Sequence, residues 1–407
     1  MQTSTAVRPQ RRADDYPYYR EIFRGRPMPF AYLDLDLFEE NIRSIAGATG
    51  GKSIRVASKS LRCVAALRRV LEADSCFQGI MCFTAREAVY LAQQGFTDLL
   101  IGYPTWNDKD IAQVAEATRD GAQITLMVDS IAHIDQIERV AEQRSVRLPV
   151  CLDIDMSVNF PGLYFGVRRS PLRDVEETRP VVERIKNAEH VWLDGVMGYE
   201  AQIAGVGDQV PGQAAKNTLV QQLKKRSLSI IAQRRREVVD MIRTSGLELR
   251  FVNGGGTGSE LTTRTEPVVT EITVGSGFYS PALFDNYKDF RYQPAVGYAI
   301  EIVRTPAPRI YTCLGGGYPA SGSAGPDKLP QPYLPEGAKL LALEGAGEVQ
   351  TPISYHGIHR LELGDPVFMR HAKAGEICER FTHLLLIQKG VIVDEVPTYR
   401  GDGQCFL

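Results

Sequence analysis

Short β-branched runs alternate with helical stretches along most of this 407-residue chain, and no other feature restricts its fold as much. Apolar residues that recur every three or four positions predict amphipathic helices, and the short apolar runs between them predict buried parallel strands. Besides a first strand at 30–35, eight strands are expected, which predicts an α/β fold of the TIM-type (β/α)8 barrel class. A doubly wound sheet is disfavoured, because no GxGxxG turn follows residues 54–59. The expected barrel strands are 54–57, 79–82, 99–102, 124–128, 149–154, 191–197, 250–253 and 271–274.

The pattern changes after about residue 285, where Pro, Gly and Tyr become frequent and the helical period ends. Short alternating runs, with a turn at 388–390 between the last two, predict a C-terminal β-rich domain over 285–407. The barrel domain is then expected over 26–284, and the surplus strand at 30–35 is free to join the β-rich domain. Residues 1–25 are polar and lack a period, so we interpret them as an N-terminal arm.

The composition excludes several classes of partner. A net charge of -2 with 24% charged residues gives no field that favours nucleic acid or an anionic membrane, so a small-molecule substrate is expected. No run approaches the roughly 18 apolar residues of a membrane span, and the polar N-terminus lacks a signal-peptide core. The seven cysteines are scattered without a CxxC pair, which is typical of reduced thiols in the cytoplasm.

Residues that follow the strands of such a barrel carry its chemistry. Lys59 follows the first barrel strand, where partial desolvation favours a nucleophilic amine, although alone it reads as a solvated loop lysine. Glycine-rich segments follow the last two strands, at 253–258 and 275–277. Backbone N–H groups in such loops bind anions, and this end of a barrel is the usual phosphate site. The sequence therefore predicts a phosphate-bearing ligand.

Two further strand ends carry polar side chains. Tyr199 and Glu200 follow the sixth barrel strand, where a phenol can contact a ligand or simply pack at the barrel rim. Asp153 and Asp155 end the fifth strand, where the carboxylates can orient a lysine or cap loop amides, and capping is the favoured interpretation.

Short motifs in a specific order complete the sequence argument. They carry a resemblance to the D-threonine aldolase and D-serine dehydratase group of the alanine racemase fold-type III pyridoxal phosphate (PLP) enzymes. The motifs occupy 30–36, 40–42, 57–60, 84–88, 100–104, 198–200, 254–258, 275–279, 363–367 and His371.

The resemblance implies a PLP-dependent lyase that cleaves β-hydroxy-D-amino acids to glycine and an aldehyde, and a homodimer. A dehydratase or deaminase is the alternative. A racemase, which needs a second base such as Tyr318 or Tyr333, and a PLP-binding protein without turnover are less favoured. Lys59 would form the Schiff base and Tyr199 would contact the cofactor. The phosphate would be held by Gly255, Gly256, Thr257, Gly275 and Ser276.

The chain departs from the metal site of this group, which is a histidine followed two residues later by Cys or Asp. Here Lys373 stands two residues after His371, and an ammonium cannot ligate a cation. Either Lys373 supplies the positive charge in place of a divalent metal, which we favour, or the ligand set is rebuilt with Glu376 or Cys378. His371 and Lys373 are accordingly candidate catalytic residues.

Two segments are left without an assigned role. The arginine that relatives place after Asp155 is missing, so the partner of the pyridine nitrogen is not assigned. Residues 204–226 are long for a barrel loop and are interpreted as a lid or an insertion.

Overall fold

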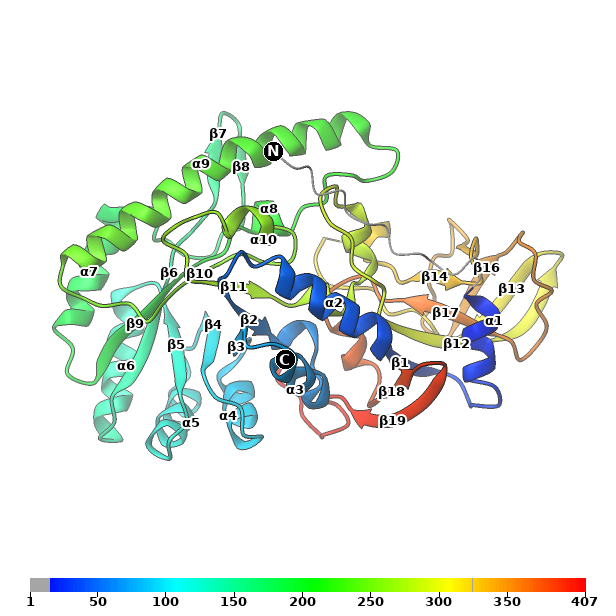
Figure 1. Ribbon diagram of the computed structural model, residues 1–407, viewed down its shortest axis with the longest axis horizontal. Helices are drawn as coiled ribbons and strands as arrows, with labels where there is room; N and C mark the ends of the chain where they lie inside the picture. The colour runs from blue at the N-terminus through cyan, green and yellow to red at the C-terminus, as the bar shows by residue number, and fades with distance from the viewer. Residues whose placement is uncertain (1–14, 324) are drawn as a thin grey trace. The chain divides into compact units, whose positions relative to one another are not determined.

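The computed structural model describes residues 15–323 and 325–407 and divides into two compact units (Figure 1). The barrel unit comprises Ile45–Lys59, Ala66–Gly275 and Phe406–Leu407. The sheet unit comprises the chain up to Ser44 together with Ser60–Ala65 and Ser276–Cys405. The chain therefore leaves the barrel unit directly after Lys59 and again directly after Gly275.

Eight parallel strands close into a barrel in the order β10-β11-β2-β3-β4-β5-β6-β9, which confirms the predicted TIM-type fold. All eight predicted strands are present within two residues of their expected ends. The strands are β2 (Ser53–Ala57), β3 (Phe77–Cys82), β4 (Leu99–Pro104), β5 (Ile124–Val128), β6 (Leu148–Asp153), β9 (Val191–Gly198), β10 (Phe251–Gly254) and β11 (Glu271–Val274).

Helices α4 to α7, which follow barrel strands, begin at side-chain caps. Thr84 accepts a hydrogen bond from the backbone N–H of Glu87, whose carboxylate in turn accepts one from the N–H of Phe83. Asn107 and Ser130 cap two further helices in the same way. The helices of the unit are α3 (Val64–Ala73), α4 (Ala85–Gln93), α5 (Asp108–Arg119), α6 (Ile131–Gln143), α7 (Val175–Lys186), α8 (Ala201–Ala204), α9 (Ala214–Thr244) and α10 (Glu260–Thr263).

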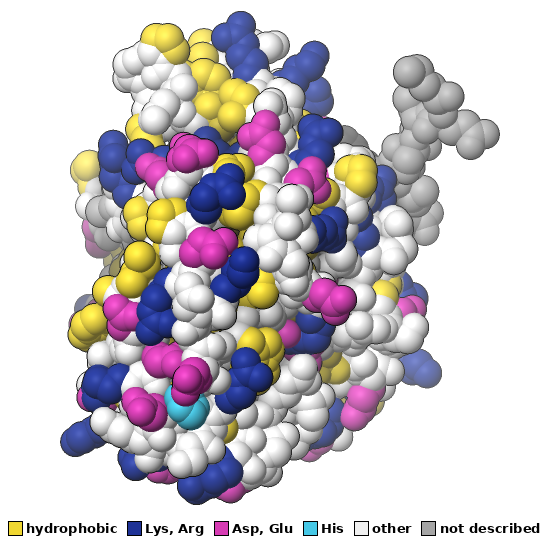
Figure 2. Space-filling model, turned by 90° about the vertical axis from the view of Figure 1, so that its left-hand side faces the viewer, with side chains coloured by type: hydrophobic (Ala, Val, Ile, Leu, Met, Phe, Trp, Pro, Cys, Tyr) yellow, Lys and Arg dark blue, Asp and Glu magenta, His cyan; other side chains and the backbone are white. Residues whose placement is uncertain are grey.

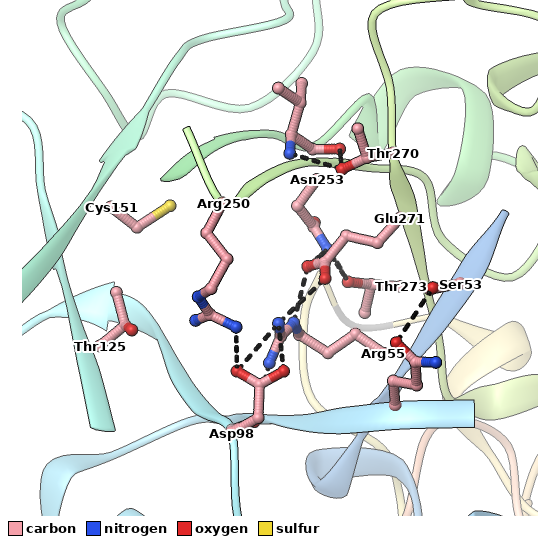
Figure 3. Close-up of polar contacts among 12 residues, drawn as sticks. Ser53, Arg55, Asp98, Thr125, Cys151, Arg250, Asn253, Thr270, Glu271 and Thr273 are labelled. Atoms are coloured by element: carbon pink, nitrogen blue, oxygen red, sulfur yellow. Dashed lines mark hydrogen bonds and ion pairs between the residues drawn. The ribbon is translucent and has the colours of Figure 1, made fainter. Parts of the chain in front are cut away.

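The barrel interior combines an apolar cluster with a buried ionic cluster. The apolar cluster consists of Leu100, Met127, Cys151, Met197 and Phe251. In the ionic cluster the fully buried Arg55 of β2 lies between two carboxylates, and Figure 3 shows the connected hydrogen bonds. Arg55 donates to both oxygens of Glu271 (2.7 and 2.9 Å) and to Asp98, while Asn253 donates to Glu271 (2.8 Å) and Arg250 pairs with Asp98 (2.9 Å).

The sheet unit contains a nine-stranded sheet, in line with the predicted C-terminal β-rich region. Its first strand, β1 (Phe30–Asp34), pairs antiparallel with β12 and parallel with β18, so the strand expected at 30–35 lies in this sheet and not in the barrel. The turn expected at 388–390 joins the last two strands through Lys389 and Gly390, both at positive φ. The other strands are β12 (Val296–Ala307), β13 (Ile310–Leu314), β14 (Gln331–Leu334), β15 (Lys339–Leu340), β16 (Gln350–Ser354), β17 (Pro366–Arg370), β18 (His383–Gln388) and β19 (Val391–Pro397).

Two helices near the N-terminus also belong to the sheet unit. Of the arm expected at 1–25, residues 1–14 lie outside the described part, and α1 (Tyr16–Ile22) forms within the remainder. The Tyr19 hydroxyl donates to the buried Asp34 carboxylate (2.6 Å), and Tyr16 donates to the carbonyl of Pro366 (3.0 Å). These contacts dock the helix onto the sheet. The second helix is α2 (Leu35–Gly47), of which residues 35–44 belong to this unit and residues 45–47 to the barrel unit.

The stretch 204–226, interpreted as a lid or an insertion, is helical from Ala214 onward, because α9 begins there and continues to Thr244. Ala, Lys, Leu and Gln dominate its first turns, and all four are strong helix formers. The sequence also did not predict the hairpin of β7 (Val158–Phe160) and β8 (Leu163–Phe165) after β6.

On the face in Figure 2, basic and acidic side chains are interspersed without a large patch of one sign. None of the described helices combines the length and apolarity that crossing a membrane requires.

Candidate cofactor site of the barrel unit

Lys59 and Tyr103 meet at the carboxyl ends of β2 and β4. Lys59 lies in the short 3-10 turn Ser58–Ser60 that follows β2, and the hydroxyl of Ser58 anchors this turn on the carbonyl of Met81 (2.9 Å). The partly buried Lys59 Nζ donates a hydrogen bond to the Tyr103 hydroxyl at 3.1 Å. An amine and a phenol in direct contact can exchange a proton.

Arg169 places a positive charge beside the same phenol. Its guanidinium carbon lies 5.6 Å from the ring centres of both Tyr103 and Tyr199. Burial alone would raise the pKa of Tyr103, but Lys59 and Arg169 reverse this effect and lower it. Burial raises the pKa of Tyr199 to about 12, against the opposing effect of Arg169, so Tyr199 remains a neutral phenol. The pKa of Tyr103 is thus lowered and that of Tyr199 raised, although both rings lie beside Arg169.

Sequence reasoning missed Arg169 and gave Tyr103 no role. The arginine expected after Asp155 is missing from residues 156–162, whereas Arg169 follows the unpredicted β7–β8 hairpin. The Arg168-Arg169 pair was the available signal, but it could not be placed without the hairpin.

The two carboxylates at the end of β6 have separate environments. Asp155 accepts hydrogen bonds from the N–H (3.0 Å) and hydroxyl (2.6 Å) of Ser157, so it caps loop amides, as favoured from the sequence. Burial and the nearby Asp129 raise the pKa of Asp153 to about 7, although Arg169 acts in the opposite direction. Asp153 can therefore accept or release a proton near neutral pH.

Replacing Asp153 by asparagine is expected to change how stability depends on pH. Its pKa is raised in the folded protein, so between about pH 4 and pH 7 the folded state holds a proton that the unfolded chain has released. The free energy of unfolding of the wild type should therefore fall as pH rises through this window. Asp153→Asn should lack this fall and be the more stable protein at about pH 8, by as much as about 4 kcal/mol.

Urea unfolding of the cofactor-free protein at about pH 5 and about pH 8 measures this difference. Asp240→Asn, on the exposed surface of α9, is the control and should follow the wild type. Parallel pH profiles for the wild type and Asp153→Asn would contradict the assignment.

Hydrogen bonds to neighbouring side chains hold the predicted glycine loop, Gly254–Gly258. The N–H of Gly255 donates to Glu200 (3.2 Å), and the N–H of Gly256 donates to the Ser259 hydroxyl (3.0 Å). A Cβ atom on Gly256 would lie 2.8 Å from the Tyr199 ring, so the glycine is needed for the close approach of loop and ring. The structure thus brings Tyr199 and this loop together, and the phosphate-binding role of the loop stays a prediction.

The chain passes from the barrel unit to the sheet unit within the second predicted phosphate segment. Gly275 ends the barrel unit, and Ser276 opens the short helix α11 (Ser276–Tyr279) of the sheet unit. The hydroxyl of Ser276 lies 3.1 Å from that of Ser60, the residue that follows Lys59.

These residues are chemically suited to PLP. The cofactor needs an amine for its aldehyde, polar partners for its ring substituents and a close-fitting anion site for its phosphate. Lys59 beside Tyr103, the cation of Arg169 between two phenol rings, and a loop where glycine is required at Gly256 match these needs.

The predicted metal-site residues lie in the sheet unit. The ring Nε2 of His371 lies 2.7 Å from the carbonyl of Ala374, and burial lowers the pKa of this histidine to about 4. Glu376 accepts hydrogen bonds from the N–H (3.1 Å) and hydroxyl (2.6 Å) of Ser321. The thiol of Cys378 donates to the carbonyl of Leu61 at 3.2 Å. Within residues 15–323 and 325–407, no three His, Cys, Asp or Glu side chains are grouped to hold a metal ion.

Similarity to known proteins agrees with this arrangement. Residues 33–281 match the family model "Alanine racemase, N-terminal domain". A 3-hydroxy-D-aspartate aldolase of Paracoccus denitrificans (strain Pd 1222) is 22% identical over 262 residues, which are 64% of this chain and 62% of the relative. A D-threonine aldolase of Arthrobacter sp is 21% identical over 250 residues, 61% of this chain and 60% of the relative. The matches therefore span about three fifths of the curated relatives' length.

Solved structures show the same fold over nearly the whole chain. The D-threonine aldolase of Filomicrobium marinum superimposes with a TM-score of 0.77 at 18% identity, covering 92% of this chain and 95% of the other. The D-threo-3-hydroxyaspartate dehydratase of Delftia sp. HT23 superimposes with a TM-score of 0.75 at 17% identity, covering 92% and 98%. Because its model matches more than half of the residues, the chain belongs to the alanine racemase N-terminal domain family.

Proposed function

We propose that this protein is a PLP-dependent lyase that cleaves β-hydroxy-D-amino acids, as D-threonine aldolase does, to glycine and an aldehyde. The observation that carries the proposal is the 3.1 Å contact between Lys59 Nζ and the Tyr103 hydroxyl at the carboxyl ends of β2 and β4. The relatives named as aldolases support the reaction class, and the dehydratase among the similar structures makes dehydration of the same substrates the second candidate.

Lys59 is the amine that would attach the cofactor, and Tyr199 would contact it as a neutral phenol. Bound PLP supplies an electron sink for charge that develops at the substrate Cα. Tyr103 accepts a hydrogen bond from Lys59, and its lowered pKa suits it to take a proton from Lys59 Nζ and return it. The phosphate would be held by Gly255, Gly256, Thr257, Gly275 and Ser276.

His371 and Lys373 are proposed to act on the substrate β-oxygen. With its pKa lowered to about 4, His371 is neutral at physiological pH, and its buried Nδ1 can accept a hydrogen bond. Lys373 supplies the positive charge that relatives obtain from a divalent metal. In keeping with the family resemblance, we also propose that the protein is a homodimer in the cytoplasm.

A substrate panel tests the reaction. PLP-loaded protein is incubated with D-threonine, D-serine and D-phenylserine, and aldehyde, keto acid and the opposite enantiomer are assayed separately. D-Threonine and D-phenylserine should give aldehyde and glycine in equal amounts. Keto acid as the main product would favour the dehydratase, and the opposite enantiomer a racemase. The absence of any product would contradict a lyase.

Repeating the panel after exhaustive chelation tests Lys373. Full activity would support its role as the fixed cation. Activity that is lost on chelation and restored by Mn²⁺ or Zn²⁺ would contradict that role.

A further inference from the structure

Glu200 is a fully buried carboxylate, and its hydrogen bonds reach α9 and the stretch of chain that follows β10. One oxygen accepts from the N–H of Gly255 (3.2 Å) and from Arg235 (3.1 Å). The other accepts from the hydroxyls of Ser259 (3.1 Å) and Thr263. Because Gly255, Ser259 and Thr263 belong to one stretch of chain after β10, a single side chain holds the whole stretch.

Arg235 compensates the negative charge of this buried carboxylate through an ion pair. It extends from α9, is fully buried, and donates to Glu200, to the carbonyl of Gly198 (2.9 Å) and to Glu266. Burial would lower the pKa of Arg235, but Glu200 and Glu266 raise it, so the guanidinium stays charged. A buried carboxylate without such a partner would be strongly unfavourable.

The glycine loop packs closely against Glu200 and Arg235. A Cβ atom on Gly254 would lie 3.2 Å from Arg235, and Gly255 has a φ of +84°, which favours glycine. The N–H of Gly256 reaches Glu200 through Ser259, whose hydroxyl accepts from Gly256 (3.0 Å) and donates to the carboxylate. Together with the hydrogen bond from the N–H of Gly258 to Glu260, these contacts fix the backbone of the loop.

We propose that Glu200 and Arg235 are positioning residues that hold the glycine loop in the shape that binds the cofactor phosphate. The inference rests on the proposed function, because it takes PLP as the ligand. A preformed loop lowers the entropic cost of binding, so its benefit should appear only for ligands that carry the phosphate. Neither residue needs to contact the cofactor.

Comparing PLP with pyridoxal, which lacks the phosphate, tests the inference. Both dissociation constants are obtained by titrating cofactor-free protein and following the visible absorbance of the lysine-bound cofactor. Glu200→Ala should weaken PLP binding by about ten-fold or more, because it removes charge-assisted hydrogen bonds, and change pyridoxal binding little. Ser259→Ala, which removes the acceptor for the Gly256 N–H and one of the donors to Glu200, should weaken PLP binding by about five-fold.

Glu200→Gln should recover much of the PLP affinity. Its amide oxygen can accept from Gly255 and Arg235, and its amide nitrogen can donate to the hydroxyls of Ser259 and Thr263. Asp208→Asn is the matched control, because Asp208 forms a buried ion pair with Lys224 (3.0 Å), which lies on α9 as Arg235 does. This variant should keep the wild-type ratio of the two affinities.

Equal losses of PLP and pyridoxal affinity in Ser259→Ala and Glu200→Ala, or no loss in either, would overturn the inference. If Glu200→Ala does not fold, Ser259→Ala alone decides. Wild-type protein that binds both ligands equally would also overturn the inference while leaving Lys59 in place. Wild-type protein that binds neither ligand would instead reject the proposed function.

Discussion

Replacing Glu271 by leucine is expected to lower the free energy of unfolding of the barrel unit by about 3 to 5 kcal/mol. Glu271 accepts two hydrogen bonds from the fully buried Arg55, and among the described residues the variant would leave Arg55 paired with the Asp98 carboxylate alone. Asn253 would lose an acceptor as well. Figure 3 shows the hydrogen bonds and ion pairs that connect these groups. Glu271→Gln keeps an acceptor for Arg55 and should cost less.

Tryptophan fluorescence in urea measures this loss for the barrel unit, because both tryptophans of the chain, Trp106 and Trp192, lie in that unit. Glu116→Gln is the control. It disrupts an exposed pair with Arg144 (3.4 Å) and should cost less than about 1 kcal/mol. A comparably small loss in Glu271→Leu would mean that Arg55 does not need this partner.

Replacing Lys59 by alanine is expected to abolish the visible absorbance of bound PLP and to reduce lyase activity by at least about 1000-fold. Lys59 is the lysine that contacts Tyr103 at the mouth of the barrel, and alanine offers no amine to the cofactor aldehyde. Absorbance titration with PLP and product assays on D-threonine measure the two effects.

Lys109→Ala is the control for this variant, since Lys109 is exposed on α5, which follows β4. It should retain both the absorbance band and the activity. An undiminished band in Lys59→Ala would show that another amine attaches the cofactor, and the proposed function would then lose its supporting residue.

The barrel was predictable because most of its strands are short apolar runs followed by an amphipathic helix, a local pattern typical of buried parallel strands. The sequence predicted one strand more than the eight that a barrel needs, and this additional strand, β1, pairs with β12 and β18 outside the barrel. Lys59, Tyr199 and the glycine loop were found because they follow strands directly.

Other features depend on contacts between residues distant in sequence. Arg169 reaches Tyr103 and Tyr199 only because a hairpin redirects the chain, and no local period announces that hairpin. Arg235 looks like one of several arginines on a polar helix until its partner Glu200 is located. The start of α9 was missed because Gly and Pro just before it suggested a loop.

The way the chain is divided between its two units limits how such a protein can diversify. The sheet unit is assembled from three separate stretches of sequence, and the barrel unit is interrupted directly after Lys59 and directly after Gly275. A gene fusion that exchanged only the C-terminal portion would leave β1 without β12 and β18. New specificity is therefore more accessible through point substitutions and loop changes than through recombination of whole modules.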